Sequence, residues 1–311
     1  MTAATAPTKR RTTGRKPATK RKPATKREVP AHLQDWAQIL DAALTLPGTA
    51  LTTYSRFYDY SLGNVILLAM QGVRTPVATF KRWSDMGYRV RKGSKAYFIN
   101  RPILFKDRDD NGDNDSGETS DAATAFKIGG FKLVPCLFEA AQVDPDPAAT
   151  TPPEPITTTD DTAEPITFET FANNVMRNLD ITTAPFQSLD GNMQGYSQGR
   201  TIAISPVAAF PDKTMLHEIA HVVLGHTDTA DPSSSTHRGI REVQAEAVAL
   251  IVGRTLGLKL PEGQMRAYVQ TWLRTTGTDA PTPAEIRPIF DACTRILNAA
   301  QAGKSTTTTD N

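Results

Sequence analysis

Two histidines that flank a glutamate form the strongest chemical pattern in this sequence. Residues 217–221 read H-E-I-A-H, and side chains four residues apart on a helix lie on the same face. Pro211 before the motif and Gly225 after it are typical of a helix start and a helix end. The pattern therefore predicts a helix on which His217 and His221 hold one Zn²⁺ ion, with Glu218 as general base.

A catalytic zinc site needs a third protein ligand and one open position for water. We expect this ligand to be Glu242, on a helix that includes residues 241–249. Glu246 lies one turn later on the same face and could accept an N–H from a ligating imidazole. Ala249 and Gly253 continue that face with small side chains, which would let the two helices approach closely.

His226 is the other residue to weigh as a ligand. It follows His217 by nine positions, whereas metzincins place their third histidine ten positions after the first, so we do not expect it to bind the ion. Two histidines with a downstream glutamate resemble the gluzincin arrangement, with Glu246 where that group commonly has Asp. The same residues would also fit a folded zinc site with little peptidase turnover.

The chemistry expected of this set is peptide hydrolysis. The ion would lower the pKa of bound water to about 7, and Glu218, next to a ligand, would take its proton. A strand around Arg200–Ile204 could align an extended protein substrate, as an edge strand does. Tyr196, His226 and His237 all stay open as residues that could stabilise the oxyanion.

A second candidate site is a basic stretch with interleaved aromatic residues. Residues 74–106 carry nine Lys and Arg against one acid, Asp85. Basic groups can follow a phosphate backbone while aromatic rings stack on unpaired bases, as in single-stranded-DNA-binding proteins. The residues expected to contact DNA are Lys81, Arg82, Trp83, Arg89, Arg91, Lys92 and Lys95. The rings that could stack are Phe80, Trp83, Tyr88, Tyr97 and Phe105. On composition alone, a solvated face over an aromatic core is the more common explanation of such a stretch.

The elements that must position these groups indicate an α+β protein of two domains. Helical periodicity near residue 32 and from 54 to 70, followed by strand patterns at 88–90, 96–105 and 131–138, predicts helices plus a small antiparallel sheet. The second domain opens with a helix near Phe168 and becomes helical again around the metal motif. The expected boundaries are a disordered basic arm 1–29, a domain 30–143, a flexible Pro/Thr linker 144–165, a domain 166–302 and a polar tail 303–311.

An acidic segment at residues 107–121 joins two of the predicted strands, and seven of its fifteen residues are acidic. Its spacing satisfies the written EF-hand pattern for calcium. A strand-like run, not a helix, precedes it, so we favour a solvated hairpin loop over a calcium site.

Charge is distributed unevenly along the chain. Residues 1–28 hold ten Lys and Arg and one acid, whereas the net charge of the whole chain is +2, so the rest of the chain is net acidic. The arm repeats K-P-A-T-K-R at 16–21 and 22–27. Such an arm could contact the phosphates of DNA or RNA or could only solubilise the protein.

The two cysteines and the hydropathy pattern bear on the compartment. Cys136 and Cys293 lie far apart in apolar surroundings, which argues against a disulfide scaffold and against a cysteine zinc site. No stretch approaches the roughly 18 apolar residues of a membrane span. We therefore expect a soluble cytoplasmic protein with no membrane partner.

Taken together, the two modules resemble the ArdC-type antirestriction family. The resemblance covers roughly residues 30–300, and its motifs are Asn64–Leu68, Gln71–Gly72, Thr79–Trp83, Val90–Lys95, Phe138 with Gln142, Leu216–His221 and Arg241–Glu246. It implies an N-terminal domain that binds single-stranded DNA and a C-terminal zincin-like metallopeptidase domain, which is also similar to ImmA/IrrE-like peptidases. The family commonly has Asp after the phenylalanine of its last N-terminal motif, where this chain has Glu139.

The leading hypothesis is a protein of a mobile element or its host that binds single-stranded DNA and carries a zinc-dependent, gluzincin-like metallopeptidase domain. Protection of incoming DNA from restriction is implied by the resemblance alone. One alternative is a DNA-binding module whose zinc domain is structural or binds a partner. Another is a metalloprotease that cleaves a repressor or a DNA-bound protein.

Overall fold

The computed structural model describes residues 27–46, 60–106, 126–149, 153, 166–188, 190, 192–228, 238–275 and 279–301. Most of the predicted basic arm, the acidic segment 107–121, most of the predicted linker, the polar tail and His237 lie outside these residues. Within them, helices and small sheets alternate along the chain, and the α+β class predicted from the sequence is confirmed.

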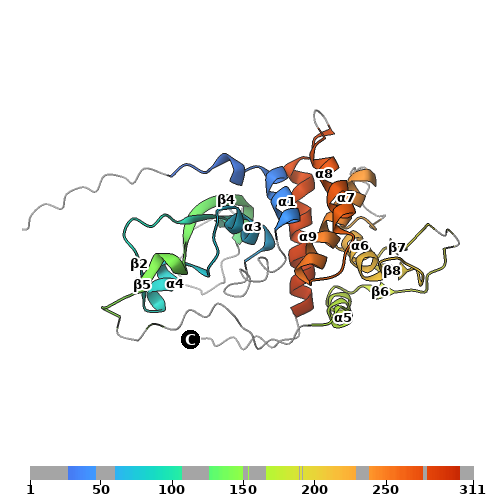
Figure 1. Ribbon diagram of the computed structural model, residues 1–311, viewed down its shortest axis with the longest axis horizontal. Helices are drawn as coiled ribbons and strands as arrows, with labels where there is room; N and C mark the ends of the chain where they lie inside the picture. The colour runs from blue at the N-terminus through green and yellow to red at the C-terminus, as the bar shows by residue number, and fades with distance from the viewer. Residues whose placement is uncertain are drawn as a thin grey trace, which may run out of the picture.

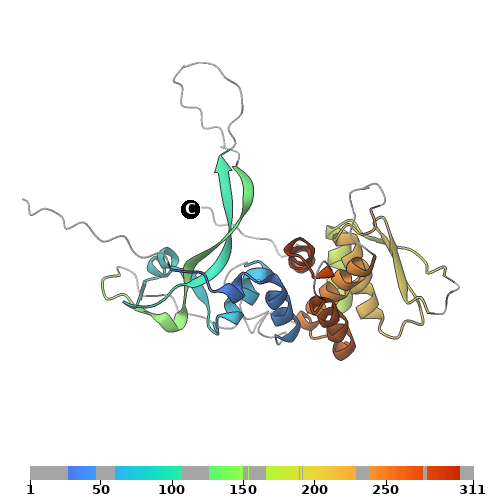
Figure 2. The same cartoon turned by 90° about the horizontal axis from the view of Figure 1, so that it is seen from above.

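The N-terminal half combines short helices with two antiparallel sheets. Its helices are η1 (Ala31–Leu33), α1 (Trp36–Thr45), α3 (Leu62–Met70), α4 (Phe80–Asp85) and η2 (Ala140–Gln142). Its strands are β1 (Val77–Thr79), β2 (Tyr88–Val90), β3 (Tyr97–Lys106), β4 (Phe126–Glu139) and β5 (Val143–Pro145). One sheet has the order β1-β4-β3 and the other pairs β2 with β5. Figure 2 shows the long β3–β4 ribbon projecting away from the helices.

Side-chain caps and a glycine set the ends of the first helices. Asp35 Oδ1 accepts the backbone N–H of Ala37 at 3.0 Å and starts α1, and Thr79 Oγ1 accepts the N–H of Arg82 and starts α4. After α3, Gly72 has a φ of 77°, a left-handed conformation that glycine adopts at little cost. These local signals are readable in the sequence, so the helix positions follow from them.

Two side-chain amides, one in α3 and one at its C-terminal cap, pair with the outer edge of β3, the strand at the end of its sheet. Asn64 accepts from the N–H of Asn100 at 2.8 Å and donates to its carbonyl at 3.0 Å. Gln71, two turns later, does the same with the N–H and carbonyl of Phe98, both at 2.8 Å. The amides thus take the place of a neighbouring strand, and they fix α3 on the sheet.

A separate small core holds α4 against the β2–β5 pair. Trp83 is its centre, with no exposed surface, and Ala78, Met86, Tyr88 and Val143 surround it. The indole N–H donates to the carbonyl of Phe138 at 2.8 Å, and the Trp83 and Tyr88 rings meet edge to face with centroids 5.7 Å apart. This core makes the short elements between residues 77 and 145 one unit.

The C-terminal half is a helical bundle with a small sheet on one side. Its elements are α5 (Phe168–Asn178), β6 (Thr182–Thr183), β7 (Gly195–Gln198), β8 (Thr201–Ile204), α6 (Pro211–Val223), α7 (Arg238–Thr255), α8 (Glu262–Leu273) and α9 (Pro283–Gln301). The sheet order is β6-β8-β7, with β6 parallel and β7 antiparallel to β8. The predicted aligning strand, Arg200–Ile204, therefore corresponds to the central β8. The expectation that it offers a free edge is wrong, because neighbours pair with both of its sides.

Helix α7 is the middle of the bundle. It packs against α6, α8, α9 and α1, and residues 247–252 are fully buried. The sequence predicts that Gly253 lets α7 approach α6, but the structure places this glycine against a different segment. A Cβ there would lie 2.6 Å from Leu260 Cδ1, so the glycine accommodates the chain that follows α7.

Helices α1 and α3 belong to the same hydrophobic core as the C-terminal bundle. Trp36 of α1 lies against Phe290 of α9 with ring centroids 5.9 Å apart, and Arg254 of α7 donates to the carbonyl of Leu44 at the end of α1. Figure 1 shows α1 and α3 beside α9, with the α4–β2–β5 unit at one end of the molecule and the β6–β8 sheet near the other. In the described part of the chain, no helix combines the length and the apolar composition that crossing a membrane requires.

The two hydrogen bonds between the Gln71 amide and the backbone of Phe98, which we call the clamp, predict a large loss of stability for one substitution. Gln71→Met keeps the size of the side chain but leaves the N–H and carbonyl of the buried Phe98 without their amide partner. We expect a loss of about 2–4 kcal/mol in the free energy of unfolding, measured by chemical denaturation. Gln38→Met, at an exposed glutamine of α1 whose side-chain amide bonds to nearby Asp35, is the matched control. Equal effects of the two substitutions would contradict the clamp.

Candidate metal centre

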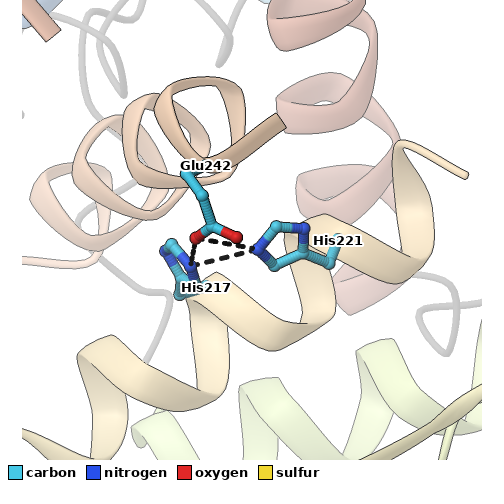
Figure 3. A group of neighbouring side chains, drawn as sticks. All are labelled: His217, His221 and Glu242. Carbon is cyan, nitrogen blue, oxygen red and sulfur yellow. Dashed lines mark hydrogen bonds and ion pairs between the residues drawn. The ribbon is translucent and has the colours of Figure 1, made fainter. Parts of the chain in front are cut away.

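Helices α6 and α7 bring His217, His221 and Glu242 together. Both imidazoles project from one face of α6, and Glu242 reaches them from the facing side of α7 (Figure 3). The two Nε2 atoms lie 3.1 Å apart, and Glu242 Oε2 lies 3.3 Å from His217 Nε2 and 3.6 Å from His221 Nε2. The three residues predicted from the sequence to hold a metal therefore place one donor atom each around a common point.

These separations fit a bound divalent cation. Ligand atoms about 2.0–2.1 Å from a tetrahedral Zn²⁺ lie roughly 3.3–3.4 Å from one another. The observed spacings of 3.1, 3.3 and 3.6 Å bracket that value. Two imidazoles and a carboxylate are also the donor types that zinc accepts, and other first-row divalent ions bind such sets. The residues present therefore fit the group that the motif implies.

A second carboxylate lies beside Nδ1 of His217, the ring nitrogen that faces away from Glu242. This Nδ1 lies 3.0 Å from Glu246 Oε2, and Lys213 Nζ lies 2.8 Å from the same oxygen. Because a carboxylate only accepts, His217 must carry its proton on Nδ1 in the neutral form, which leaves the Nε2 lone pair toward Glu242 and His221. Glu246 thus lies beside a candidate ligand and is not one of the three converging donors.

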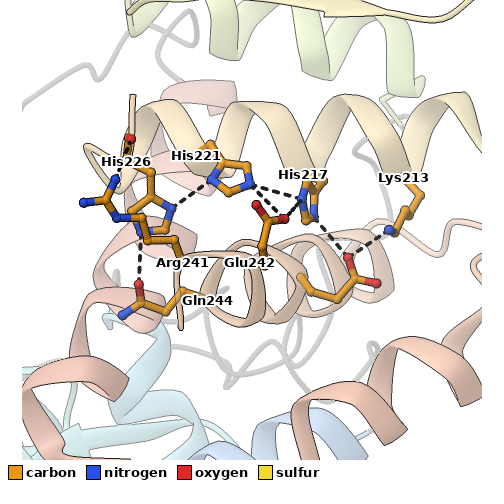
Figure 4. Close-up of polar contacts among 8 residues, drawn as sticks. Lys213, His217, His221, His226, Arg241, Glu242 and Gln244 are labelled. Atoms are coloured by element: carbon orange, nitrogen blue, oxygen red, sulfur yellow. Dashed lines mark hydrogen bonds and ion pairs between the residues drawn. The ribbon is translucent and has the colours of Figure 1, made fainter. Parts of the chain in front are cut away.

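A third histidine lies beside Nδ1 of His221, as Glu246 lies beside Nδ1 of His217. His226 Nδ1 lies 2.9 Å from His221 Nδ1, and His226 Nε2 lies 3.0 Å from Gln244 Oε1 (Figure 4). Gln244 Nε2 in turn donates to the carbonyl of Glu285 at 2.6 Å. His226 is therefore not one of the three converging donors, as its spacing in the sequence predicts. Its contact with His221 was not part of that prediction.

Charges and burial shift the pKa values at this centre in opposite directions. Burial opposes protonation of His217, but its hydrogen bonds to Glu242 and Glu246 outweigh burial and raise its pKa to about 9. The bond to His217, followed by that to His221, holds the pKa of Glu242 far below its ordinary range. Burial and then the neighbouring His221 lower the pKa of His226 to about 4, so His226 is neutral at physiological pH. A proton on His217 thus occupies the space between the donors when no metal is bound.

Glu218, the predicted general base, is buried at the junction of α6 and the sheet. A Cβ on Gly195 of β7 would lie 3.2 Å from Glu218 Oε1 and 2.8 Å from Thr214 Cγ2. Glycine is therefore required for β7 to approach α6 this closely, and Glu218 lies against the outer strand of the sheet. Of the residues weighed as oxyanion stabilisers, Tyr196 lies on this same strand.

Tyr268 of α8 is a group near the site that the sequence pattern did not indicate. Burial, followed by the charges of Glu242 and Glu246, raises the pKa of its hydroxyl. The charges of Glu242 and Glu246 therefore act on the phenol, although the side chain is exposed. Because it belongs to a separate helix, no spacing rule on α6 or α7 could have found it.

The residues predicted to contact DNA lie on or near the α4–β2–β5 unit. Six of them are exposed, namely Lys81, Arg82, Arg89, Arg91, Lys92 and Lys95. Trp83 is the exception and corrects that prediction, because its ring is enclosed in the small core and cannot stack on a base. Tyr88 is buried as well, and the Tyr97 hydroxyl donates to Glu139 at 2.8 Å. Phe80, by contrast, is 59% exposed beside Lys81 and Arg82.

Comparisons with known proteins agree with the N-terminal resemblance. Residues 27–130, about a third of the chain, match the family described as the N-terminal domain of anti-restriction factor ArdC. Two crystal structures of the antirestriction ArdC protein from plasmid R388 are similar to this chain, a metal-free one with 21% identity and a TM-score of 0.45, and a Mn(II)-bound one with 22% identity and a TM-score of 0.48. Each alignment covers 86% of this chain and 95% of the other. No curated protein sequence matches the chain.

The raised pKa of His217 predicts how the stability of the metal-free protein depends on pH. The folded state binds this proton more tightly than the unfolded chain, whose histidine pKa is about 6.5, so the stabilisation is complete below pH 6.5. It is lost as the pH rises through about 9. With a chelator present, we expect the melting temperature of the wild type to fall relative to His217→Gln across this window. A difference between the two proteins that does not change with pH would contradict the assignment.

Proposed function

We propose that this chain is a metal-dependent peptidase with a gluzincin-like site, joined to a DNA-binding region, and that it acts in antirestriction. The observation that carries the peptidase half is the convergence of His217, His221 and Glu242 on one point, with Glu218 next in the chain. Zinc is the first choice of ion because two imidazoles and one carboxylate are a common catalytic zinc set.

A divalent ion bound there would supply Lewis acidity, polarising a peptide carbonyl and lowering the pKa of bound water. The chain itself supplies the remaining functions. Glu218 accepts a proton at its carboxylate and can pass it to a leaving amine. Glu246 and Lys213 hold the proton of His217 on Nδ1, so its Nε2 stays available for the ion.

The outer strand β7 suits an extended protein substrate. It pairs with β8 on one side, and within the described residues no strand pairs with its other side. Such an edge can bind an extended peptide through backbone hydrogen bonds. Glu218 lies beside Gly195 of this strand, so a peptide on the edge would run past the proposed base.

The DNA-binding half of the proposal concerns single-stranded DNA on the α4–β2–β5 unit. The ArdC N-terminal match over residues 27–130 supports an antirestriction role with DNA binding. The exposed basic residues named above could follow phosphates, and Phe80 could stack on an unpaired base. We place the DNA-binding domain within residues 30–143 and the metal-binding domain within residues 166–302. Helices α1 and α3 lie in the first range of residues, but they pack in the hydrophobic core of the second domain.

Metal analysis combined with one isosteric variant tests the peptidase half. After loading with Zn²⁺ or Mn²⁺, we expect about one ion per chain in the wild type and loss of it in His217→Ala and Glu242→Ala. Glu218→Gln should keep the ion and lose cleavage of an unfolded protein substrate by at least about 100-fold.

Glu169→Gln, at an exposed glutamate of α5, is the control for the loss of a carboxylate. Full occupancy in Glu242→Ala would show that the ligand set is wrong. A wild type that binds the ion but cleaves nothing would favour the second candidate, a zinc domain with a structural or partner-binding role.

Two exposed phenylalanines allow a matched test of the DNA half. Phe80 and Phe131 are 59% and 58% exposed, but Phe80 lies on α4 and Phe131 on the β3–β4 ribbon. We expect Phe80→Ala to weaken binding of labelled single-stranded DNA roughly 5- to 100-fold in anisotropy titrations at low salt, because a base loses its stacking partner. Phe131→Ala should have little effect. The reverse result would move the site to the ribbon, and no micromolar binding by the wild type would refute DNA binding.

A further inference from the structure

We propose that His226 and Gln244 are positioning residues that fix the tautomer of His221 through a hydrogen-bond chain ending at a backbone carbonyl. The inference rests on the proposed metal site and assigns a role to residues outside the ligand set. The chain runs from Glu285 O through Gln244 and His226 to His221 Nδ1.

The direction of every hydrogen bond in this chain follows from its anchored end. The carbonyl of Glu285 can only accept, so the Gln244 atom 2.6 Å away must be the amide nitrogen. The amide oxygen of Gln244 then faces His226 Nε2, which must carry a proton in order to donate. With one proton on each ring, His226 Nδ1 is bare, and at 2.9 Å it accepts from His221 Nδ1–H. His221 is left with its lone pair on Nε2, facing His217 and Glu242.

The end of α6 brings His226 back to His221. Gly225 has a φ of 75°, its N–H bonds to the carbonyl of Val222 at 3.2 Å, and the N–H of His226 bonds to the carbonyl of His221 at 2.9 Å. These are the paired bonds of a Schellman motif, in which a left-handed glycine follows the helix. The motif turns the chain back on itself, so that residue 226 is joined to residue 221 through both backbone and side chain.

Neighbouring groups hold His226 in this orientation. Arg241 Nη1 donates to its backbone carbonyl at 3.3 Å, and both Arg241 and Gln244 come from α7, the helix that also carries Glu242. The two candidate histidine ligands thus have different supports. His217 is held by a carboxylate neutralised by Lys213, and His221 is held by a neutral imidazole. A neutral support fixes orientation without adding a second negative charge beside Glu242.

The test uses the full chain and measures zinc affinity by competition with a chelator. His226→Leu keeps much of the side-chain volume but cannot accept from His221, and we expect a 10- to 100-fold weaker affinity. In His226→Asn the side-chain oxygen takes the place of Nδ1, so the affinity should recover to within about 3-fold of wild type. In chelator, both variants should melt at about the same temperature as the wild type. A large drop in the melting temperature of the metal-free variants would instead indicate a purely structural role of His226.

Nitrogen NMR of histidine-labelled, zinc-loaded wild type gives an independent readout. We expect His226 to be protonated on Nε2 and bare on Nδ1, and His221 to be protonated on Nδ1. Protonation of His226 on Nδ1, or unchanged zinc affinity in His226→Leu, would overturn the inference. If the wild type binds no metal at all, the proposed function fails instead, so the two failures are distinguishable.

Discussion

The packing of α6 against α7 places three electron-pair donors within 3.1 to 3.6 Å of one another, and much of the surrounding structure follows from that constraint. Lone pairs at such distances repel unless a proton or a cation lies between them. Without metal, a proton on His217 meets this need, which explains its raised pKa and the lowered pKa of Glu242. A metal ion would replace that proton, so binding and protonation compete at the same point.

Holding three donors at one point requires rigid helices. Helix α7 has this rigidity because it is enclosed by four other helices, including α1 from the N-terminal half. Arg254 extends the connection by donating to the end of α1. Helix α1 therefore contributes to the support of the metal centre, although it lies far from it in the sequence and contributes none of its candidate ligands.

The α4–β2–β5 unit depends on a different balance. Trp83 and Tyr88 form its core, whereas the basic residues around them stay in solvent. An aromatic residue within a basic stretch can either pack in a core or contact a nucleic-acid base, and its burial decides between the two. Phe80 is left as the ring that faces solvent there, and it meets Phe138 edge to face with ring centroids 6.4 Å apart. The same basic and aromatic stretch thus forms both a structural core and a candidate surface for contact with DNA.

The sequence by itself determined the features that depend on local spacing. Residues 217–221 specify two imidazoles on one helix face, Asp35 and Thr79 specify helix starts, and Gly225 specifies a helix end, because each depends on neighbours within one or two turns. Only the tertiary structure decided which groups from other elements meet them. Burial of Trp83, the central position of β8, the contact of Gly253 with Leu260 and the hydrogen bond of His226 to Gln244 all depend on how distant segments pack. No periodicity in the sequence encodes these contacts.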